Sequence, residues 1–313
     1  MRILVTGAAG FVGKWLCLEL LAQGHDVIGA VRDPADLDCL TEQWRSDLAE
    51  VTWIDFELLS GDSVEAALSA RPDAIVHLAA IASGAAARAN PLEAWRVNCL
   101  GTCGLIYALE RSGQQVRLLV ASTGEVYGGQ VVRPALETDR LVPCSPYAAS
   151  KLGAELATLE YWRRTSGDVV VVRPFAQTGP GQGAEYVVPA FAGRILKAKR
   201  LGVDTVSVGS LAPVREFVDV RDVATALAVL IENGLAGEVY NIAQGRGTSL
   251  DALFALISDE AEWHGTPVAD PVLFRDADIP YLVGDGSKLA RFGWKPDREL
   301  RDTIRDLLSG VGY

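Results

Sequence analysis

Hydrophobic and polar positions in the first half of the chain follow two alternating patterns. Short continuous runs of Val, Ile and Leu, bounded by turn-forming residues, are typical of strands that are buried on both faces. Longer stretches repeat their apolar positions every three or four residues, as an amphipathic helix does. The short runs predict strands at Ile3–Thr6, Val27–Val31, Val51–Asp55, Ala74–Leu78, Leu118–Ser122 and Val169–Arg173. The longer stretches predict helices at Val12–Gln23, Ser63–Ala70, Leu92–Arg111 and Pro146–Arg164.

This regular alternation of strand and helix predicts an α/β fold built on a doubly wound parallel sheet. Parallel neighbours need a long crossover, which a helix supplies, and such crossovers are right-handed. The helices then cover both faces of the sheet, which explains why the strands are apolar throughout. Ligands bind sheets of this kind at the carboxyl ends of the strands. The residues that follow each predicted strand are therefore the first candidates for chemistry.

The pattern changes after about Phe175, where glycine and proline gather in the segment Gln177–Gly183 and indicate a loop. The elements predicted beyond it are helices at Val187–Lys199, Val220–Glu232, Leu250–Trp263 and Leu300–Leu308, with strands at Thr205–Val208, Arg215–Val218 and Val239–Ile242. We predict a first domain over 1–175 and a smaller C-terminal α/β lobe over 176–313. Some segments of the second part, for example 219–243, are expected to return to the first sheet.

A glycine turn joins the first predicted strand to the first predicted helix, in the order Thr6-Gly7-Ala8-Ala9-Gly10-Phe11-Val12-Gly13. Gly7 permits the tight turn, Gly10 lets the backbone approach a pyrophosphate, and Gly13 lets helix and strand pack closely. The first N–H groups of the helix have no partner within it and can bind an anion. Because strand–helix units follow directly, the first domain is predicted to be a Rossmann-type domain that binds NAD(P).

The tip of the second predicted strand bears on the choice between NAD and NADP. An NAD site usually places a carboxylate there for the ribose 2′-hydroxyl, whereas an arginine favours the 2′-phosphate of NADP. Val31 occupies the tip, and Arg32 and Asp33 follow it. We therefore predict NADP, with NAD possible because Asp33 is close enough along the chain to reach the ribose.

Tyr147 and Lys151 stand four residues apart in a predicted helix, so both side chains lie on one face, one turn apart. An ammonium beside a phenol favours the phenolate and is expected to lower the pKa of the tyrosine. Such a tyrosine can exchange a proton with a substrate oxygen while a hydride moves to or from the carbon. The strand Leu118–Ser122 leads into Thr123, whose hydroxyl is expected to hold a carbonyl oxygen beside Tyr147.

Together these segments resemble the extended short-chain dehydrogenases/reductases, the epimerases, dehydratases and reductases of nucleotide sugars. The resemblance covers essentially the whole chain. The matching segments are Thr6–Gly13, His77–Ala80, Val97-Asn98, Ser122–Gly128, Ser145–Lys151, Arg173–Phe175 and Arg215–Asp222. It implies a homodimer, because members of this family commonly pair through two long helices of the first domain, here Leu92–Arg111 and Pro146–Arg164.

The resemblance also implies roles for individual residues. Tyr147 would be the acid/base, Lys151 would bind the nicotinamide ribose, and Thr123 would orient the sugar oxygen. The residues implied at the cofactor are Gly7, Gly10, Phe11, Val12, Gly13, Arg32, Asp55, Leu78, Ala79, Ala80, Asn98 and Pro174, together with Tyr147 and Lys151.

The second half is most similar to the branch of the family that acts on GDP-mannose derivatives. Arg215 and Arg275 would there contact the diphosphate and ribose of the sugar nucleotide, since two arginines suit bidentate binding of a diphosphate. The family's Arg-x-Phe-Asn pattern reads Arg173-Pro174-Phe175-Ala176 here, so Gln177 is the candidate to replace the missing asparagine.

We predict NADPH-dependent reduction of the C4 ketone of a GDP-4-keto-6-deoxyhexose. Glu125 keeps a second reaction open, because a glutamate at this position removes a proton in the 4,6-dehydratases of the family. The alternatives are therefore a 4,6-dehydratase or a C4-epimerase with tightly bound NAD(P). A regulator that senses NAD(P) without catalysis is the alternative from another class, and the complete set of Thr123, Tyr147 and Lys151 counts against it.

Composition narrows the choice of partners and compartment. The formal net charge of −11 disfavours nucleic acid and anionic membranes as partners. No secretory signal is evident and no apolar run is long enough for a bilayer, so a soluble cytoplasmic protein is expected. The five cysteines have no CxxC spacing. Cys99 and Cys103, four apart in a predicted helix, are interpreted as buried small residues rather than metal ligands, and no metal is expected.

Overall fold

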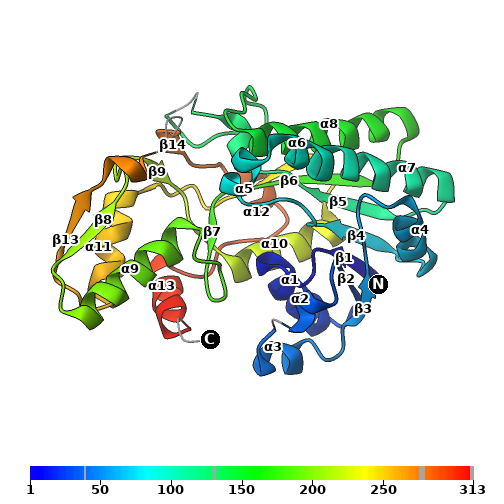
Figure 1. Ribbon diagram of the computed structural model, residues 1–313. Helices are drawn as coiled ribbons and strands as arrows, with labels where there is room; N and C mark the ends of the chain where they lie inside the picture. The colour runs from blue at the N-terminus through cyan, green and yellow to red at the C-terminus, as the bar shows by residue number, and fades with distance from the viewer. Residues whose placement is uncertain (39, 130–131, 275–278, 311–313) are drawn as a thin grey trace.

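A seven-stranded, entirely parallel sheet forms the centre of the protein (Figure 1). The structure, a computed structural model, describes residues 1–38, 40–129, 132–274 and 279–310. The strand order is β11-β6-β5-β4-β1-β2-β3. The strands are β1 (Arg2–Thr6), β2 (Asp26–Val31), β3 (Thr52–Asp55), β4 (Ala74–His77), β5 (Arg117–Ala121), β6 (Val169–Pro174) and β11 (Val239–Ile242). The predicted α/β fold with a doubly wound parallel sheet is confirmed.

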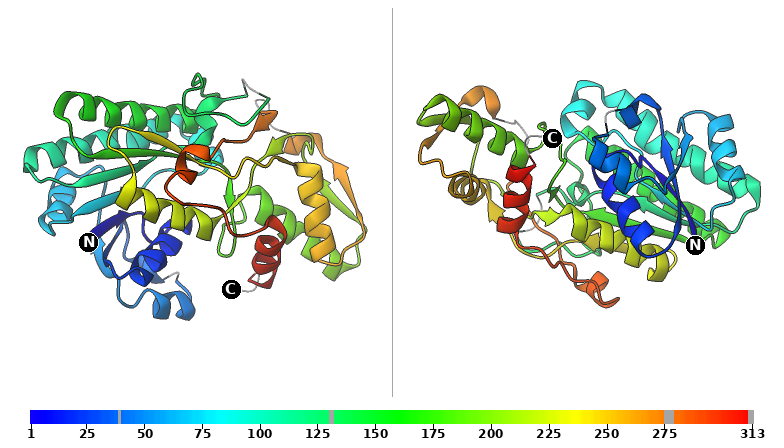
Figure 2. Two further views of the ribbon diagram at one scale, coloured as in Figure 1. Left: turned by 180° about the vertical axis from the view of Figure 1, so that it is seen from behind. Right: turned by 90° about the horizontal axis from the view of Figure 1, so that it is seen from below.

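Helices cover both faces of this sheet, as Figures 1 and 2 show. One face packs against α1 (Phe11–Ala22) and α10 (Val220–Asn233), and the other packs against α4 (Gly61–Ser69), α7 (Thr102–Ser112) and α8 (Pro146–Thr165). Successive strand residues point to opposite faces, so Val5 belongs to the first core layer and Leu4 to the second. Each fully buried aliphatic side chain stabilises the fold by about 1.5–3 kcal/mol.

A second lobe lies beside this unit (Figure 1). Its core is formed by α9 (Val187–Leu201), α11 (Leu250–Glu260), α13 (Leu300–Ser309) and β8 (Thr205–Val208). The exposed strand β13 (Thr266–Ala269) pairs in parallel with β8. The chain segment that contains α10 and β11 packs with the large sheet instead. The division of the chain at residue 175 remains a prediction.

Short elements complete the fold. One pair and one triplet of short strands connect the two parts. The pair is β7 (Gln177–Thr178) with β10 (Val218–Asp219), and the triplet is β12 (Thr248–Ser249), β9 (Val214–Arg215) and β14 (Tyr281–Leu282). The short helices are α2 (Ala35–Asp38), α3 (Glu42–Asp47), α5 (Gly84–Ala89), α6 (Pro91–Ala94) and α12 (Ser287–Ala290), with 3₁₀ turns η2 (Gly124–Tyr127) and η3 (Pro271–Leu273). Among the described residues, no helix is both long and apolar enough to cross a membrane.

Two predicted elements differ from the structure. The predicted helix Leu92–Arg111 is divided into α6, a π-helical stretch η1 (Trp95–Gly101) and α7, and π-helical turns often accompany functional sites. The predicted strand Arg215–Val218 is two strands, β9 and β10, that pair with different partners. Glu216 separates them, because its buried carboxylate accepts backbone N–H groups from Gly284, at 2.8 Å, and from the chain after β11.

Candidate active site

A cleft of about 1240 Å³ opens at the carboxyl ends of the central strands. Its walls come from the glycine turn, the segment after β4, the end of β5, the start of α8 and the loop between β7 and α9. The strand order reverses between β1 and β4, and this is the place where doubly wound sheets bind dinucleotides. Side chains of both lobes line the same cleft, so it can hold a cofactor and a second molecule.

The glycine turn has the shape that a dinucleotide requires. Gly7 has a φ of +71°, which side chains other than glycine rarely adopt. A Cβ atom on Gly13 would lie 2.3 Å from the Gly7 carbonyl oxygen, so only glycine fits between helix and strand there. Gly10 caps α1 without a side-chain hydrogen bond, which leaves the first N–H groups of the helix available to an anion. The predicted residues Gly7, Gly10, Phe11, Val12 and Gly13 all line the cleft.

At the tip of β2, Arg32 lines the cleft and Asp33 does not. The Asp33 carboxylate instead accepts the backbone N–H of Ala35 at 2.9 Å. Asp36, on α2, is the acidic residue that lines the cleft here, and Asp55, predicted at the adenosine, lies outside its lining. The arrangement favours a 2′-phosphate over a free 2′-hydroxyl, since the strand tip presents a guanidinium.

A buried chain of hydrogen bonds fixes the segment after β4, where the predicted residues Leu78, Ala79 and Ala80 line the cleft. The Thr102 hydroxyl donates to the Asn98 carbonyl at 2.6 Å, so it accepts from Nε2–H of His77 at 3.1 Å. Nδ1 of His77 therefore accepts from the Thr6 hydroxyl at 2.8 Å. Burial, with the Lys151 ammonium nearby, lowers the pKa of His77 to about 3, so this imidazole stays neutral.

Asn98, predicted at the cofactor, acts from behind the cleft and does not line it. Its amide pairs with the backbone of Ile81, accepting at 2.7 Å and donating at 3.2 Å. It also donates to the Ser150 hydroxyl at 3.0 Å, and Ser150 donates to the Tyr147 carbonyl at 2.8 Å. Asn98 thereby ties the cleft wall at Ile81 to the first turn of α8.

Tyr147, Lys151 and Thr123 meet in the cleft at the start of α8. Ser145 caps this helix by accepting the Ala148 N–H at 3.1 Å, which sets the direction of its first turn. Lys151 is only 3% exposed, and burial lowers its pKa to about 8. The Thr123 hydroxyl hydrogen-bonds with the Tyr147 phenol.

The expected lowering of the Tyr147 pKa is wrong. Burial raises the pKa of this phenol, the Glu125 carboxylate raises it further, and the hydrogen bond with Thr123 only partly opposes them. The physical reason is that removing a phenolate from water costs more than one neighbouring hydroxyl returns. Tyr147 is therefore held in its protonated form.

Glu125, on η2, lies close to two phenols. Its carboxylate accepts a hydrogen bond from Ser145 at 3.3 Å and raises the pKa of Tyr147. It also raises the pKa of Tyr186, after burial and Glu185. Tyr186 precedes α9 and lines the cleft from the second lobe. The sequence analysis missed Tyr186, whose only signal is its place between the glycine-rich loop and an apolar helix.

Two of the predicted substrate residues line the cleft from the short strands β7 and β9. Arg215 and Gln177 line the cleft, as does Pro174, which was predicted at the cofactor. The side-chain oxygen of Gln177 is buried and has no partner in the described part of the chain, so it is available to a ligand donor. The Ser122 hydroxyl, next to Thr123 in the cleft wall, is also buried and has no partner among the described residues. The sequence pattern did not single it out. Arg275 lies outside the described residues.

Comparisons with known proteins agree with this geometry. Residues 3–243 match the model of the NAD dependent epimerase/dehydratase family. The GDP-6-deoxy-D-mannose reductase of Pseudomonas aeruginosa is 34% identical over 98% of this chain and 96% of its own. The GDP-6-deoxy-D-talose 4-dehydrogenase of Aggregatibacter actinomycetemcomitans is 31% identical over 92% of this chain and 90% of its own. A solved structure of RMD from Pseudomonas aeruginosa complexed with NADPH superposes with a TM-score of 0.83 at 31% identity, over 99% of this chain and 98% of that one.

Proposed function

This chain belongs to the NAD-dependent epimerase/dehydratase family of extended short-chain dehydrogenases/reductases, as its sequence resemblance predicted, and from this we propose that it is an NADPH-dependent nucleotide-sugar reductase. Its substrate would be a GDP-4-keto-6-deoxyhexose, whose C4 ketone becomes a hydroxyl. The observation that carries the proposal is one cleft lined by the glycine turn, Thr123, Tyr147 and Lys151. The two GDP-sugar relatives, which align over nearly the whole chain, support the choice of substrate class.

The chain holds the cofactor through groups of three kinds. The N–H groups at the start of α1 bind the pyrophosphate, Arg32 pairs with the 2′-phosphate, and Lys151 binds the nicotinamide ribose. NADPH supplies, when bound, the hydride that reduces the carbonyl carbon. The preference for NADPH rests on Arg32 at the β2 tip and is supported by the NADPH complex of the similar protein from Pseudomonas aeruginosa.

Tyr147 provides the proton that completes the alcohol. Because its pKa is raised, the phenol carries its proton at neutral pH and can donate it to the ketone oxygen as that oxygen gains negative charge. The resulting phenolate lies one helical turn from Lys151, whose ammonium stabilises it. Thr123 donates a second hydrogen bond to the substrate oxygen and so fixes it beside the phenol.

The sugar nucleotide is held by the wall that the second lobe contributes. Arg215 can bind the diphosphate with two parallel N–H donors. The unpartnered Gln177 oxygen accepts a hydrogen bond from a hydroxyl or amide of the ligand, since a buried acceptor without a donor is costly. This takes the place of the asparagine that relatives carry at the preceding position.

One observation favours a second reaction of the same family. The Glu125 carboxylate lies close to Tyr147 and Tyr186, where a base could remove a proton next to a newly formed ketone. A 4,6-dehydratase or a C4-epimerase would use this arrangement and keep its cofactor between turnovers. The reductase is preferred because two relatives are GDP-sugar enzymes of C4 redox chemistry and because Arg32 at the β2 tip favours NADPH, the reductant.

Three measurements on the purified protein separate these reactions. The purified protein is mixed with GDP-4-keto-6-deoxymannose and NADPH, and the loss of NADPH absorbance is followed, with the Tyr147→Phe variant as control. Turnover by the wild type alone supports the reductase. No turnover of the ketone, combined with release of bound NAD(P) from denatured protein and conversion of GDP-mannose without added cofactor, would establish the dehydratase instead.

We also propose a cytoplasmic homodimer. Large apolar side chains are exposed along α6, η1, α7 and α8, notably Leu92 at 82% and Leu100 at 63%, together with Trp95, Tyr107 and Leu156. Helices with such a face are suited to packing against a second copy. The four described cysteines are free thiols, which fits a reducing compartment. Light scattering on the wild type and on Leu100→Glu would test the dimer, the variant being expected to be monomeric.

A further inference from the structure

The loop between β7 and α9 forms part of the cleft wall, through Gly181, Gln182 and Gly183. The Gln182 side chain braces this loop from inside, because it donates to the Gln177 carbonyl at 2.8 Å and accepts from the Thr178 hydroxyl at 2.8 Å. Gly179, at a φ of +147°, packs directly against α10, where a Cβ atom would lie 2.9 Å from Cγ1 of Val220. These contacts fix the shape of the loop.

This loop is joined to the cofactor helix by one side chain. The indole N–H of Trp15, on α1, donates to the carbonyl of Pro180 at 3.2 Å across 165 residues of sequence. Among the described hydrogen bonds it is the one that ties α1 directly to this loop. Trp15 lies just after the glycine turn, so the contact fixes the loop relative to the same helix that begins at the pyrophosphate site.

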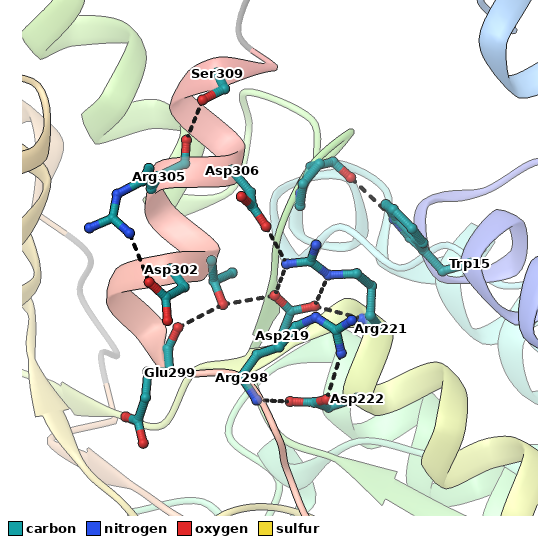
Figure 3. A network of polar contacts seen from close by, with 12 residues as sticks. Trp15, Asp219, Arg221, Asp222, Arg298, Glu299, Asp302, Arg305, Asp306 and Ser309 are labelled. Atoms are coloured by element: carbon teal, nitrogen blue, oxygen red, sulfur yellow. Dashed lines mark hydrogen bonds and ion pairs between the residues drawn. The ribbon is translucent and has the colours of Figure 1, made fainter.

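Trp15 is itself held in place by a network of charges (Figure 3). The Arg221 guanidinium lies over the Trp15 ring, 5.8 Å from its centroid. The same guanidinium pairs with Asp219 at 2.7 and 2.9 Å and with Asp306 of α13 at 2.8 Å. Asp219 also accepts from the Thr303 hydroxyl at 2.7 Å, which leaves Arg221 little freedom to rotate. Trp15 also contacts Trp44 edge to face, with 5.0 Å between the two ring centroids.

We propose that Trp15 is a positioning residue, which sets the distance between the cofactor helix and the cleft-lining loop and so aligns the sugar nucleotide with the nicotinamide. Arg221 acts through Trp15, because its flat cation holds the indole at the angle that the bond to Pro180 needs. The loop lines the part of the cleft that receives the sugar nucleotide, so a small shift of the loop weakens binding of the substrate more than binding of the cofactor. The kinetic part of this inference rests on the proposed function.

The Trp15→Phe variant tests it, because phenylalanine keeps an aromatic ring beside Arg221 and Trp44 but lacks the indole N–H and the second ring. The matched control is Trp44→Phe, the same exchange in the neighbouring ring, which makes no described hydrogen bond to the second lobe. For Trp15→Phe the KM for GDP-4-keto-6-deoxymannose should rise roughly three- to tenfold, as expected for one lost hydrogen bond. The NADPH dissociation constant should stay within about twofold, because the pyrophosphate site is intact. An unchanged KM, or an equal loss of NADPH affinity, would overturn the inference.

A second measurement does not depend on the reaction. Hydrogen–deuterium exchange of the amides in 179–186 should be faster in Trp15→Phe than in the wild type and unchanged in Trp44→Phe. Equal exchange in all three proteins would overturn the inference even if the wild type proves to be a reductase. If the wild type does not reduce the ketone, the proposed function fails and this exchange measurement alone decides whether Trp15 holds the loop.

A double-mutant cycle checks the role of Arg221. Arg221→Lys keeps a cation between Asp219 and Asp306 but loses the flat face over Trp15. It should raise the KM in the same direction as Trp15→Phe, and the combined variant should be no worse than Trp15→Phe alone, because both act on one contact. Additive effects on KM would show that Arg221 acts elsewhere.

Discussion

Thr6 and His77 face each other on neighbouring strands β1 and β4, and their side chains are joined by a hydrogen bond of 2.8 Å. The Thr6 oxygen also accepts the backbone N–H groups of Leu78 and Ala79, at 3.2 and 3.1 Å. One hydroxyl at the end of β1 therefore shapes the cleft wall after β4, while His77 passes the restraint on to Thr102. Buried, uncharged side chains therefore hold this wall of the cofactor site in place through hydrogen bonds.

Replacing His77 by leucine should destabilise the protein by about 1–3 kcal/mol, because the buried hydroxyls of Thr6 and Thr102 each lose a partner. NADPH should also bind more weakly, since the wall at Leu78 and Ala79 loosens. Urea unfolding and fluorescence titration with NADPH measure the two effects. Thr102→Ser, which keeps the hydroxyl, serves as control and should stay near the wild type.

His77 also gives stability a pH dependence. Its pKa in the folded protein, about 3, is far below the ordinary value of 6.5, so between these pH values the unfolded chain binds the extra proton. The contribution of this group is therefore fully present above pH 6.5 and is lost as the pH falls toward 3. The stability difference between wild type and His77→Leu should shrink over this window. A difference that stays constant from neutral to acid pH would contradict the assignment of a neutral, buried imidazole.

Tyr147→Phe should lower the turnover number by roughly 100- to 10,000-fold, the range for loss of a general acid. NADPH affinity should be nearly unchanged, because the proposed role of the phenol is to donate a proton to the substrate oxygen. Stopped-flow kinetics and cofactor titration together provide the measurement. Full activity in this variant would remove Tyr147 from the mechanism.

Lys151 should govern the alkaline side of the pH profile. With its pKa lowered to about 8 by burial, the ammonium loses its charge as the pH rises through that value, and stabilisation of the Tyr147 phenolate is lost with it. The kcat/KM of the wild type should therefore fall above about pH 8. Lys151→Arg keeps its charge, so its lower activity should lack this fall. The same alkaline limb in both proteins would assign the titration to another group.

Gly13→Ala should destabilise the protein by roughly 1–3 kcal/mol and weaken NADPH binding, because helix α1 must move away from β1. The new Cβ atom would meet backbone, 2.3 Å from the Gly7 oxygen and 2.7 Å from the Ala8 Cα, and backbone cannot yield as a side chain does. Gly193→Ala is the control: it is a helical glycine in α9 with no atom within 4 Å of the added carbon. That exchange should stabilise the protein by about 0.5–1 kcal/mol. Thermal unfolding of both variants measures these changes in stability, and equal stability of the two variants would contradict the prediction.

Arg32→Ala should raise the KM for NADPH roughly 10- to 100-fold, as for loss of a charge-assisted hydrogen bond, and leave the KM for NADH nearly unchanged. NADH is the built-in control because it lacks the 2′-phosphate. An equal rise in the KM for NADPH and for NADH would show that Arg32 does not bind the 2′-phosphate.

The local features of this protein were determined by its sequence. The sequence pattern alone predicts the alternation of strands and helices, the glycine turn, and the shared helix face of Tyr147 and Lys151. Each of these depends only on backbone geometry within a few residues. The family of the chain followed from such segments and is confirmed.

Tertiary structure decided which of these local features act together. Trp15 and Pro180 are 165 residues apart, and Thr6 and His77 are 71 apart, so no periodicity along the chain relates them. Packing also placed Asn98 behind the cleft, Asp55 outside it and Tyr186 within it. The raised pKa of Tyr147 has the same origin, since burial and the Glu125 charge exist only once distant segments have closed around the phenol.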